Sequence, residues 1–404
     1  MGNPSGLSPP VLPTTAATME FADWTSLPAD LINRIADCLL ATSDLDYYMD
    51  FRAVCQSWRS ATDDPKNTPD PRLRPRHWVN VEKSKTHLLL VNTTTGRVLL
   101  KELPLLRHYH IAVSTRDGLL ILNDRESFNT VSVLNPFTGY WIRFIAPVPD
   151  EFVESATLLS GSSPTLVMLL CNKLYADIDP DGSLQDASRK VYMGDPSSES
   201  FVVYEEKDAC PLIRLAARGI HTNGGSGSES PFPLAVAKRI FDLMRYFNVD
   251  LEMSDDEDTM MSEDEAAWNF WIGFGNRCFL LGSAGEILII IRIKEGLEIY
   301  KMDTDRYTLE HVKNIGNRAI FLGGYCKCIS VNADMFPSVD ANCIYYIKGA
   351  RLSDGFDMYG DTMYKDIHMY NLPRRRETRI SEDKEYDSPP YTIIQLLSGS
   401  LTGW

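Results

Sequence analysis

Two pairs of metal-ligating side chains stand two positions apart in this sequence: His108 with His110, and Cys326 with Cys328. Side chains at this spacing share one face of a strand, so each pair could give two ligands to one ion. A zinc site needs two more ligands, and the chain holds no CxxC or HxxxH sequence to supply them. We interpret the histidines as a solvated strand edge and the cysteines as reduced thiols, and we expect no metal or cofactor.

Four acidic residues are expected near strand ends, where carboxylates could do acid–base chemistry: Asp117, Asp124, Glu286 and Asp303. Glycosidases use two carboxylates that flank the scissile bond. Acidic residues are also ordinary turn residues. The sequence lacks G-x-S-x-G, P-loop and H-E-x-x-H motifs. We therefore expect no catalytic residues, and a glycan-processing enzyme remains the less favoured alternative.

Composition narrows the class of protein. The 404 residues are 44% hydrophobic and 24% charged, as in a globular protein, and the formal charge is −15. The acidic run 250–265 supplies nine of these negative charges, and nothing resembles the basic face of a nucleic-acid binder. No apolar run reaches about 18 residues, so we expect no membrane span. Scattered cysteines suggest reduced thiols and an intracellular protein of the cytoplasm, the nucleus or both.

The N-terminal part predicts two short helices with apolar stripes. The first begins after Leu27-Pro28, because proline suits the start of a helix, and a polar break at 42–44 precedes the second. The stretch FRAVCQSWRSA (51–61) then carries apolar residues every three or four positions. About 38 residues are too few to enclose a core, so another surface must cover these stripes.

After residue 78, short β-rich runs alternate with turn signals, including TLVMLL, CISVN, CIYYI and TIIQLL. Asn92-Thr-Thr-Thr-Gly96 and Asn135-Pro-Phe-Thr-Gly139 each follow an apolar run, 43 positions apart. A similar shape begins at Asp303, another 168 positions on, which is four times 42. A period of about 40–45 residues is typical of propeller blades. The spacing therefore predicts six or seven blades.

These patterns divide the chain into five segments. We expect a disordered N-terminus at 1–20, a helical unit at 21–62, a Pro-rich linker at 63–77 and a β-propeller domain at 78–400, interrupted by a helix and acidic loop at 218–266. The predicted fold is a small all-α unit followed by an all-β propeller of six or seven blades. The Pro-rich segment could also lie on the propeller as a loop.

The helical unit resembles an F-box. The matching residues are Leu27-Pro28-x-Asp30-Leu31, then Ile35 and Leu39, then Arg52-x-Val54-Cys55-x-x-Trp58-Arg59; Gln56 departs from the basic residue common at its position. The resemblance implies docking on a Skp-type adaptor and, through it, a cullin–RING ubiquitin ligase. The residues implied in adaptor contact or in its hydrophobic support are Leu27, Pro28, Leu31, Ile32, Ile35, Val54, Cys55 and Trp58.

The remaining chain resembles the KIB-type β-propeller that accompanies F-boxes in a large plant family. LNPFTG (134–139), GEILIIIR (285–292), LEIYKMD (297–303) and the segment 315–347 carry this resemblance. Together, the two resemblances imply a non-catalytic receptor subunit that presents an unknown target protein to the ligase, with no nucleic-acid or membrane partner. An F-box scaffold acting outside ubiquitination is an alternative that the sequence leaves open.

Overall fold

The computed structural model describes residues 24–42, 44–66, 71–84, 86–126, 130–148, 152–161, 163–171, 189–205, 278–283, 285–293, 296–303, 306, 308–323, 327–347, 367–380 and 392–402. The expected disordered N-terminus at 1–20 and the expected insertion at 218–266 lie outside them, as does Cys326.

The N-terminal helices follow the predicted pattern with one added break. After the short turn η1 (Trp24–Ser26) come α1 (Ala29–Ala41), α2 (Leu45–Ala53) and α3 (Gln56–Ala61). As expected, α1 begins behind Pro28, whose carbonyl accepts the first helical hydrogen bonds. The second expected helix is divided, because Cys55 is extended, with φ −156° and ψ 170°. The residues Val54 and Trp58 therefore belong to different segments.

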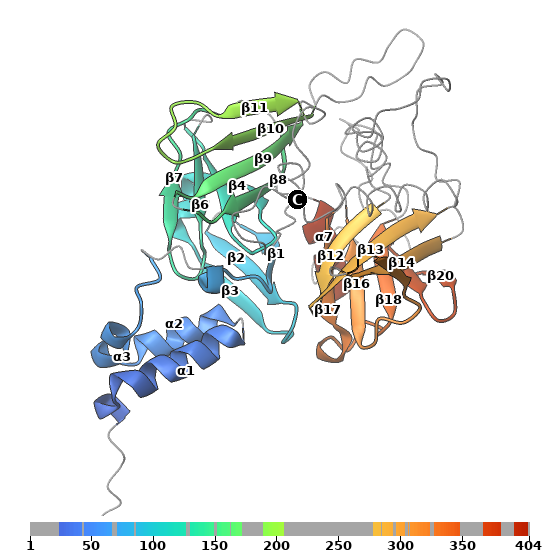
Figure 1. Cartoon of the computed structure of the whole chain (residues 1–404), viewed down its shortest axis with the longest axis horizontal. Coiled ribbons are helices and arrows are strands. Elements are labelled where there is room, and N and C mark those ends of the chain that lie inside the picture. Colours follow the sequence, from blue (N-terminus) through green and yellow to red (C-terminus); the bar gives the residue numbers. More distant parts are fainter. Residues whose placement is uncertain are drawn as a thin grey trace, which may run out of the picture.

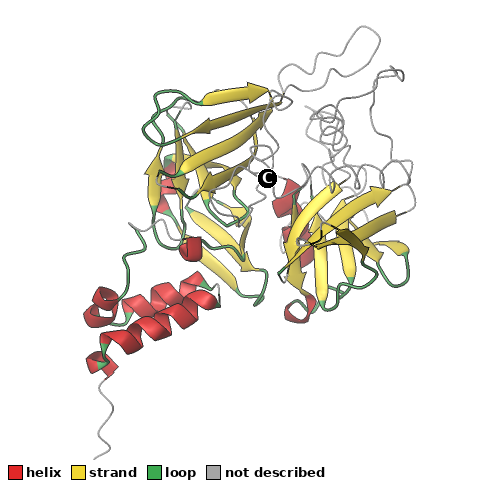
Figure 2. Cartoon of the chain, in the orientation of Figure 1, coloured by secondary structure: helices red, strands yellow, loops and turns green. Residues whose placement is uncertain are grey.

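Five sheets follow the helices (Figure 2). Their strands are β1 (Trp78–Lys83), β2 (His87–Asn92) and β3 (Val98–Glu102); β4 (Tyr109–Ser114), β5 (Leu120–Asp124), β6 (Val131–Leu134) and β7 (Trp141–Arg143); β8 (Phe152–Leu159), β9 (Thr165–Cys171), β10 (Arg189–Gly194) and β11 (Val202–Glu205); β12 (Cys278–Ser283), β13 (Glu286–Ile293), β14 (Gly296–Asp303) and β15 (Thr308–His311); and β16 (Arg318–Leu322), β17 (Cys328–Asn332), β18 (Cys343–Ile347), β19 (Ile367–Asn371) and β20 (Arg376–Arg379). Short turns η2 (Pro71–Leu73), η3 (Pro104–Arg107) and η5 (Ala333–Met335) and the helix α7 (Ile393–Thr402) complete the described elements.

The first four sheets are antiparallel meanders, each strand pairing with the next in sequence. The fifth has the order β17-β16-β18-β19-β20, with β16 and β18 parallel. Hydrophobic clusters join the second sheet to the third and the fourth to the fifth, and a third cluster joins the first sheet to the fifth. Arg116, in the β4–β5 turn, donates to Leu280 O on β12 at 2.7 Å. The sheets are therefore blades of one ring.

The expected architecture is wrong in two respects. The described residues form five blades, where the sequence predicted six or seven. They contain four short α-helices, and the three N-terminal ones share a hydrophobic cluster with the first two blades. Figure 1 shows these helices near β2 and β3. In the part of the chain that the structure describes, no separate all-α F-box domain precedes the propeller, because these helices are too short to enclose a core of their own and share that of the first two blades.

The repeated turn explains the error in blade number. Asn92 and Asn135 begin the outer hairpins of the first two blades, where each side-chain oxygen accepts two backbone N–H groups; Gly96 and Gly139 follow with φ +71° and +72°. These two turns are confirmed. Asp303 begins the corresponding hairpin of the fourth blade, so two blade steps, rather than four, separate it from Asn135.

The two remaining blades carry the same turn chemistry. Asp195 accepts from Ser197 N at the β10–β11 turn, and Asn371 accepts from Arg374 N at the β19–β20 turn. All five outer hairpins thus start with an Asp or Asn side chain bonded to the turn backbone. These two turns do not stand out in the sequence, because the long connections make the spacing uneven: residues 206–277 separate β11 from β12.

The C-terminal helix occupies a position predicted as a strand. TIIQLL (392–397) was expected in β structure, but the chain is helical from Ile393. Leu397 is fully buried and joins the cluster between the first and fifth blades, and α7 contacts β1, β16 and β18 (Figure 1). A short apolar run fits a buried helix or a buried strand, so periodicity alone could not decide.

Candidate docking surface on the N-terminal helices

Helix α1 has one covered and one uncovered apolar stripe. Ile32 is 1% exposed and Ala36 is also buried, and both belong to the cluster shared with the propeller. Leu31 and Ile35 are each 39% exposed, although they lie on the same helix at a spacing of four. Pro28, which precedes the helix, is exposed as well. The uncovered stripe is therefore available to another molecule.

The segment after α2 adds to this surface. Val54, between α2 and α3, is 59% exposed, and α3 contacts both α1 and η1. Trp58 is half-buried: its ring centroid lies 4.5 Å from that of Phe51, and its indole N–H donates to Trp24 O at 3.0 Å. Trp58 thus ties η1 to α3 and supports the surface from one side.

The eight residues that the sequence indicated do not have equal access. Pro28, Leu31, Ile35 and Val54 are exposed, Leu27, Cys55 and Trp58 are half-buried, and Ile32 is buried. Ile32 therefore belongs to the core that the helices share with the propeller, and the other seven retain some exposure. We call Pro28, Leu31, Ile35 and Val54 the docking stripe.

The sequence did not predict one exposed residue of this region. Trp24 is 64% exposed, and its backbone is held by the bond from Trp58 and its neighbour Thr25 by a bond from Ser57 Oγ, each 3.0 Å long. An exposed indole beside apolar side chains was visible in the sequence only as a tryptophan three residues before Leu27. Its exposure depends on η1 folding back on α3.

Arg52 stabilises the inner side of the same helices. It is 7% exposed, and its Nη1 donates to Thr62 O at 3.1 Å, to Thr62 Oγ1 at 2.9 Å and to Asp63 O. These acceptors lie where the chain leaves α3. Arg52 therefore fixes the exit of the chain from α3.

A second arginine joins the corner between α1 and α2 to the first blade. Arg97 Nη1 donates to Asp44 Oδ2 and its Nη2 to Asp46 Oδ2, each at 2.7 Å, and its guanidinium carbon lies 4.1 Å from the Tyr47 ring centroid. Burial acts to lower the pKa of Arg97, but the hydrogen bonds to Asp44 and Asp46 outweigh it and raise that pKa. This cation therefore stays charged in its half-covered site.

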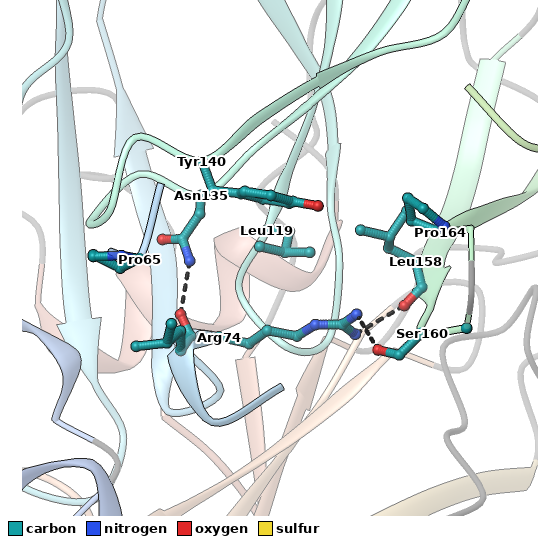
Figure 3. Close-up of a pocket in the computed structure, with 10 residues that line it drawn as sticks. Pro65, Arg74, Leu119, Asn135, Tyr140, Leu158, Ser160 and Pro164 are labelled. Carbon is teal, nitrogen blue, oxygen red and sulfur yellow. Dashed lines mark hydrogen bonds between the residues drawn. The ribbon is translucent and has the colours of Figure 1, made fainter. Parts of the chain in front are cut away.

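The segment before β1 lies against the second and third blades (Figure 3). Asn135 Nδ2 donates to Leu73 O at 2.7 Å, and Arg74 donates to Leu158 O and Ser160 Oγ, each at 2.8 Å, and also to Asp117. Leu73, Arg74, Asn135, Leu158 and Ser160 line a small pocket that is partly open to solvent. The Arg74 guanidinium already donates to protein acceptors, so the pocket marks a structural contact between blades.

The acidic residues considered for catalysis have structural partners. Glu286 receives bonds from Lys301 at 2.8 Å and Arg318 at 3.0 Å, and the hydrogen bond from Lys301, followed by the one from Arg318, holds its pKa below the usual range. Asp117 pairs with Arg74, and Asp124 and Asp303 accept backbone N–H groups in turns. Each carboxylate is therefore engaged in holding a turn or a blade in place.

The metal-ligand candidates are also dispersed. His108 is exposed in the turn before β4, and His110 lies half-buried on that strand. Within the described ranges, no group of three or more His, Cys, Asp or Glu side chains is placed to hold a metal ion. The helices in those ranges are also too short or too polar to cross a membrane.

Five blades arranged as one ring, each ending in an Asx-initiated hairpin, define a β-propeller. Propellers present loops and blade rims for protein interaction. The sequence profile of the KIB1-4 β-propeller matches residues 90–371, which is more than half of the chain, so the chain belongs to this family. Among curated proteins, none matches this chain.

Proposed function

We propose that this chain is the substrate-recognition subunit of an SCF-type ubiquitin ligase. In this proposal its N-terminal helices, whose sequence resembles an F-box, dock on a Skp-type adaptor, and its propeller binds a target protein. The observation that carries the proposal is the docking stripe: Leu31, Ile35 and Val54 stay 39–59% exposed, whereas Ile32 and Ala36 of α1 are buried in the cluster that the helices share with the first blades. This role is intracellular and non-catalytic.

The chemistry of such a receptor is binding alone. Apolar area removed from water stabilises a complex by about 25 cal/mol per Å², and association entropy cancels much of this gain. A few central anchors usually dominate the remainder. Holding the target near a charged ubiquitin conjugate then raises the rate of transfer through proximity, while the covalent steps occur on other subunits.

The direct test is co-purification with a Skp-type adaptor. Replacing both Leu27 and Pro28 with alanine should abolish adaptor capture while the propeller keeps its thermal transition. Asn33→Ala is the matched control, because Asn33 is exposed on α1 away from the docking stripe. Capture that persists in the double variant, or that is lost in the control, would contradict the proposal.

Recovery of the cullin separates a ligase subunit from a scaffold. If the adaptor and the cullin are both captured with the wild-type chain, the ligase role is supported. Capture of the adaptor without the cullin, at matched expression, would indicate an adaptor-binding scaffold acting outside ubiquitination. Proximity labelling with and without proteasome inhibition would then identify proteins that accumulate beside the propeller.

A further inference from the structure

We propose that Arg97 is a positioning residue that holds the N-terminal helices, and with them the docking stripe, in one orientation against the propeller. Arg97 lies on the β2–β3 turn of the first blade, and both of its carboxylate partners lie at the corner between α1 and α2. The consequence for ubiquitin transfer rests on the proposed function; the positioning itself does not.

The arginine is held on both sides. Its backbone carbonyl accepts Asn92 N at 2.8 Å within the turn that Asn92 initiates, so its own position is fixed by the hairpin. Its side chain then divides between two carboxylates, of which Asp44 is 2% exposed. Two charge-assisted bonds from one planar group to two residues restrict rotation as well as distance.

Aromatic rings fix the plane of the guanidinium. Its carbon lies 4.1 Å from the centroid of Tyr47, on the helices, and 5.6 Å from that of Trp78, on the blade. Trp78 is itself buried in the cluster that joins helices and propeller. The cation therefore contacts an aromatic ring from each body that it connects.

The hydrophobic cluster alone would not set an orientation. Apolar burial is non-directional, so it attaches the helices to the blades without specifying their angle. Directional hydrogen bonds set the angle between the helices and the blades, and Arg97 provides two of them, to the largely buried carboxylates of Asp44 and Asp46. A second ion pair, Arg72 with Asp37, also links the region before β1 to α1, but its side chains are 57% and 65% exposed. Pairs of this kind contribute little, which makes Arg72 a matched control.

The test is a distance distribution between the two bodies of the full chain. Spin labels would be attached through ketone-bearing residues at Asn33 on α1 and Glu310 on β15, both exposed. We expect a narrow distribution in the wild type, an unchanged one in Arg72→Ala, and one broadened by roughly twofold in Arg97→Ala, since apolar contact leaves rotation open. The width of the distribution for Arg97→Lys should lie between those of the wild type and Arg97→Ala, because the ammonium group of lysine lacks the planar set of donors that lets a guanidinium bond two carboxylates.

A second variant guards against unfolding. Arg97→Ala leaves the Asp44 carboxylate buried without its arginine partner. Combining Arg97→Ala with Asp44→Ala removes that buried charge and still lacks the bonds between the first blade and the helices. The double variant should melt closer to the wild type and still show the broad distribution. A distribution as narrow as the wild type in either folded variant would overturn the positioning role.

The consequence is tested separately in a reconstituted ligase. In the wild-type chain, where the helices are held in one orientation, we expect ubiquitin to be attached to few of the chain's own propeller lysines. In Arg97→Ala we expect more of these lysines to be modified, at unchanged adaptor affinity. An unchanged lysine pattern beside a broadened distance distribution would overturn the consequence. If the wild-type chain fails to bind the adaptor at all, the proposed function fails, whereas the distance measurement still decides the role of Arg97.

Discussion

Leu31 and Ile32 are neighbours on α1 and almost equal in hydrophobicity, yet Leu31 is 39% exposed and Ile32 is 1% exposed. Ile32 meets the cluster that contains Leu73, Trp78 and the first strands of the propeller. Leu31, with Ile35, lies on the adjoining stripe that no described element covers completely. One helix therefore serves two surfaces, one that builds the protein and one that remains open.

The difference shows what an apolar arc on a helix means. The apolar arc of α1 is wider than its neighbours α2, α3 and η2 cover, and its buried part is centred on Ile32 and Ala36. Periodicity locates the whole arc but does not divide it between an internal and an external partner. Substitutions on the two stripes should therefore affect different measurements.

The largest effect is expected on the covered stripe. Ile32→Ala should lower the free energy of unfolding by about 3 kcal/mol, because a fully buried aliphatic side chain is lost and leaves a cavity. Urea denaturation followed by tryptophan fluorescence would measure it. Leu31→Ala is the control and should change stability by less than about 1 kcal/mol. Equal losses for the two variants would remove the distinction between the stripes.

The next effect concerns the polar support behind the covered stripe. Arg52→Met keeps the aliphatic stem but removes the bonds to Thr62 and Asp63, and should cost about 2 kcal/mol of folding stability, in the range for hydrogen bonds from a charged group. Arg34→Met, at an exposed position of α1, should be close to neutral. A neutral Arg52→Met would show that the exit from α3 is held by packing alone.

The uncovered stripe should respond in binding. Leu31→Ala and Ile35→Ala should each weaken adaptor affinity by about 1–2 kcal/mol, roughly tenfold, with little change in melting temperature. Titration calorimetry against the adaptor would report the affinity, with Asn33→Ala as the control. Full affinity in both variants would place the adaptor contact elsewhere on the chain.

The smallest effect is a pH dependence on the covered side. Burial, with a smaller contribution from Arg76, lowers the pKa of His77, just before β1. The unfolded chain therefore binds a proton more readily, and stability should fall as the pH drops below the ordinary histidine value of 6.5 towards the lowered one. His77→Gln should flatten this dependence, whereas His108→Gln, at an exposed turn, should preserve it. A wild-type slope retained in His77→Gln would assign it to other groups.

Local patterns predicted most of the elements. The start of α1 behind Pro28 and the turns at Asn92 and Asn135 depend on neighbouring residues, so the sequence was sufficient for them. The number of blades, in contrast, does not depend on neighbouring residues alone. The interval from Asn135 to Asp303 includes the long connection at 206–277, which the spacing counted as two further blades. A period can be read only where insertions do not interrupt it.

The candidate site was predicted in part for the same reason. Seven of the eight indicated residues keep some exposure, but the burial of Ile32 depends on tertiary packing: α1 packs on α2, α3 and η2, and Ile32 belongs to the hydrophobic cluster that these elements share with the first two blades. Arg97 was missed altogether because its partner Asp44 is 53 positions away and becomes a neighbour only when the first blade folds. Such long-range polar pairs leave no periodic signal in a single sequence.

The helix α7 has a consequence for how the chain is made. It packs on β1, more than 300 residues earlier in the sequence, and on β16 and β18, so the first and fifth blades share a core that includes its side chains. On a ribosome, the N-terminal helices and early blades emerge long before this segment. The shared core must therefore wait for late synthesis, and contacts of such high sequence separation form slowly. Until then, the face of β1 that α7 will cover stays open to chaperones.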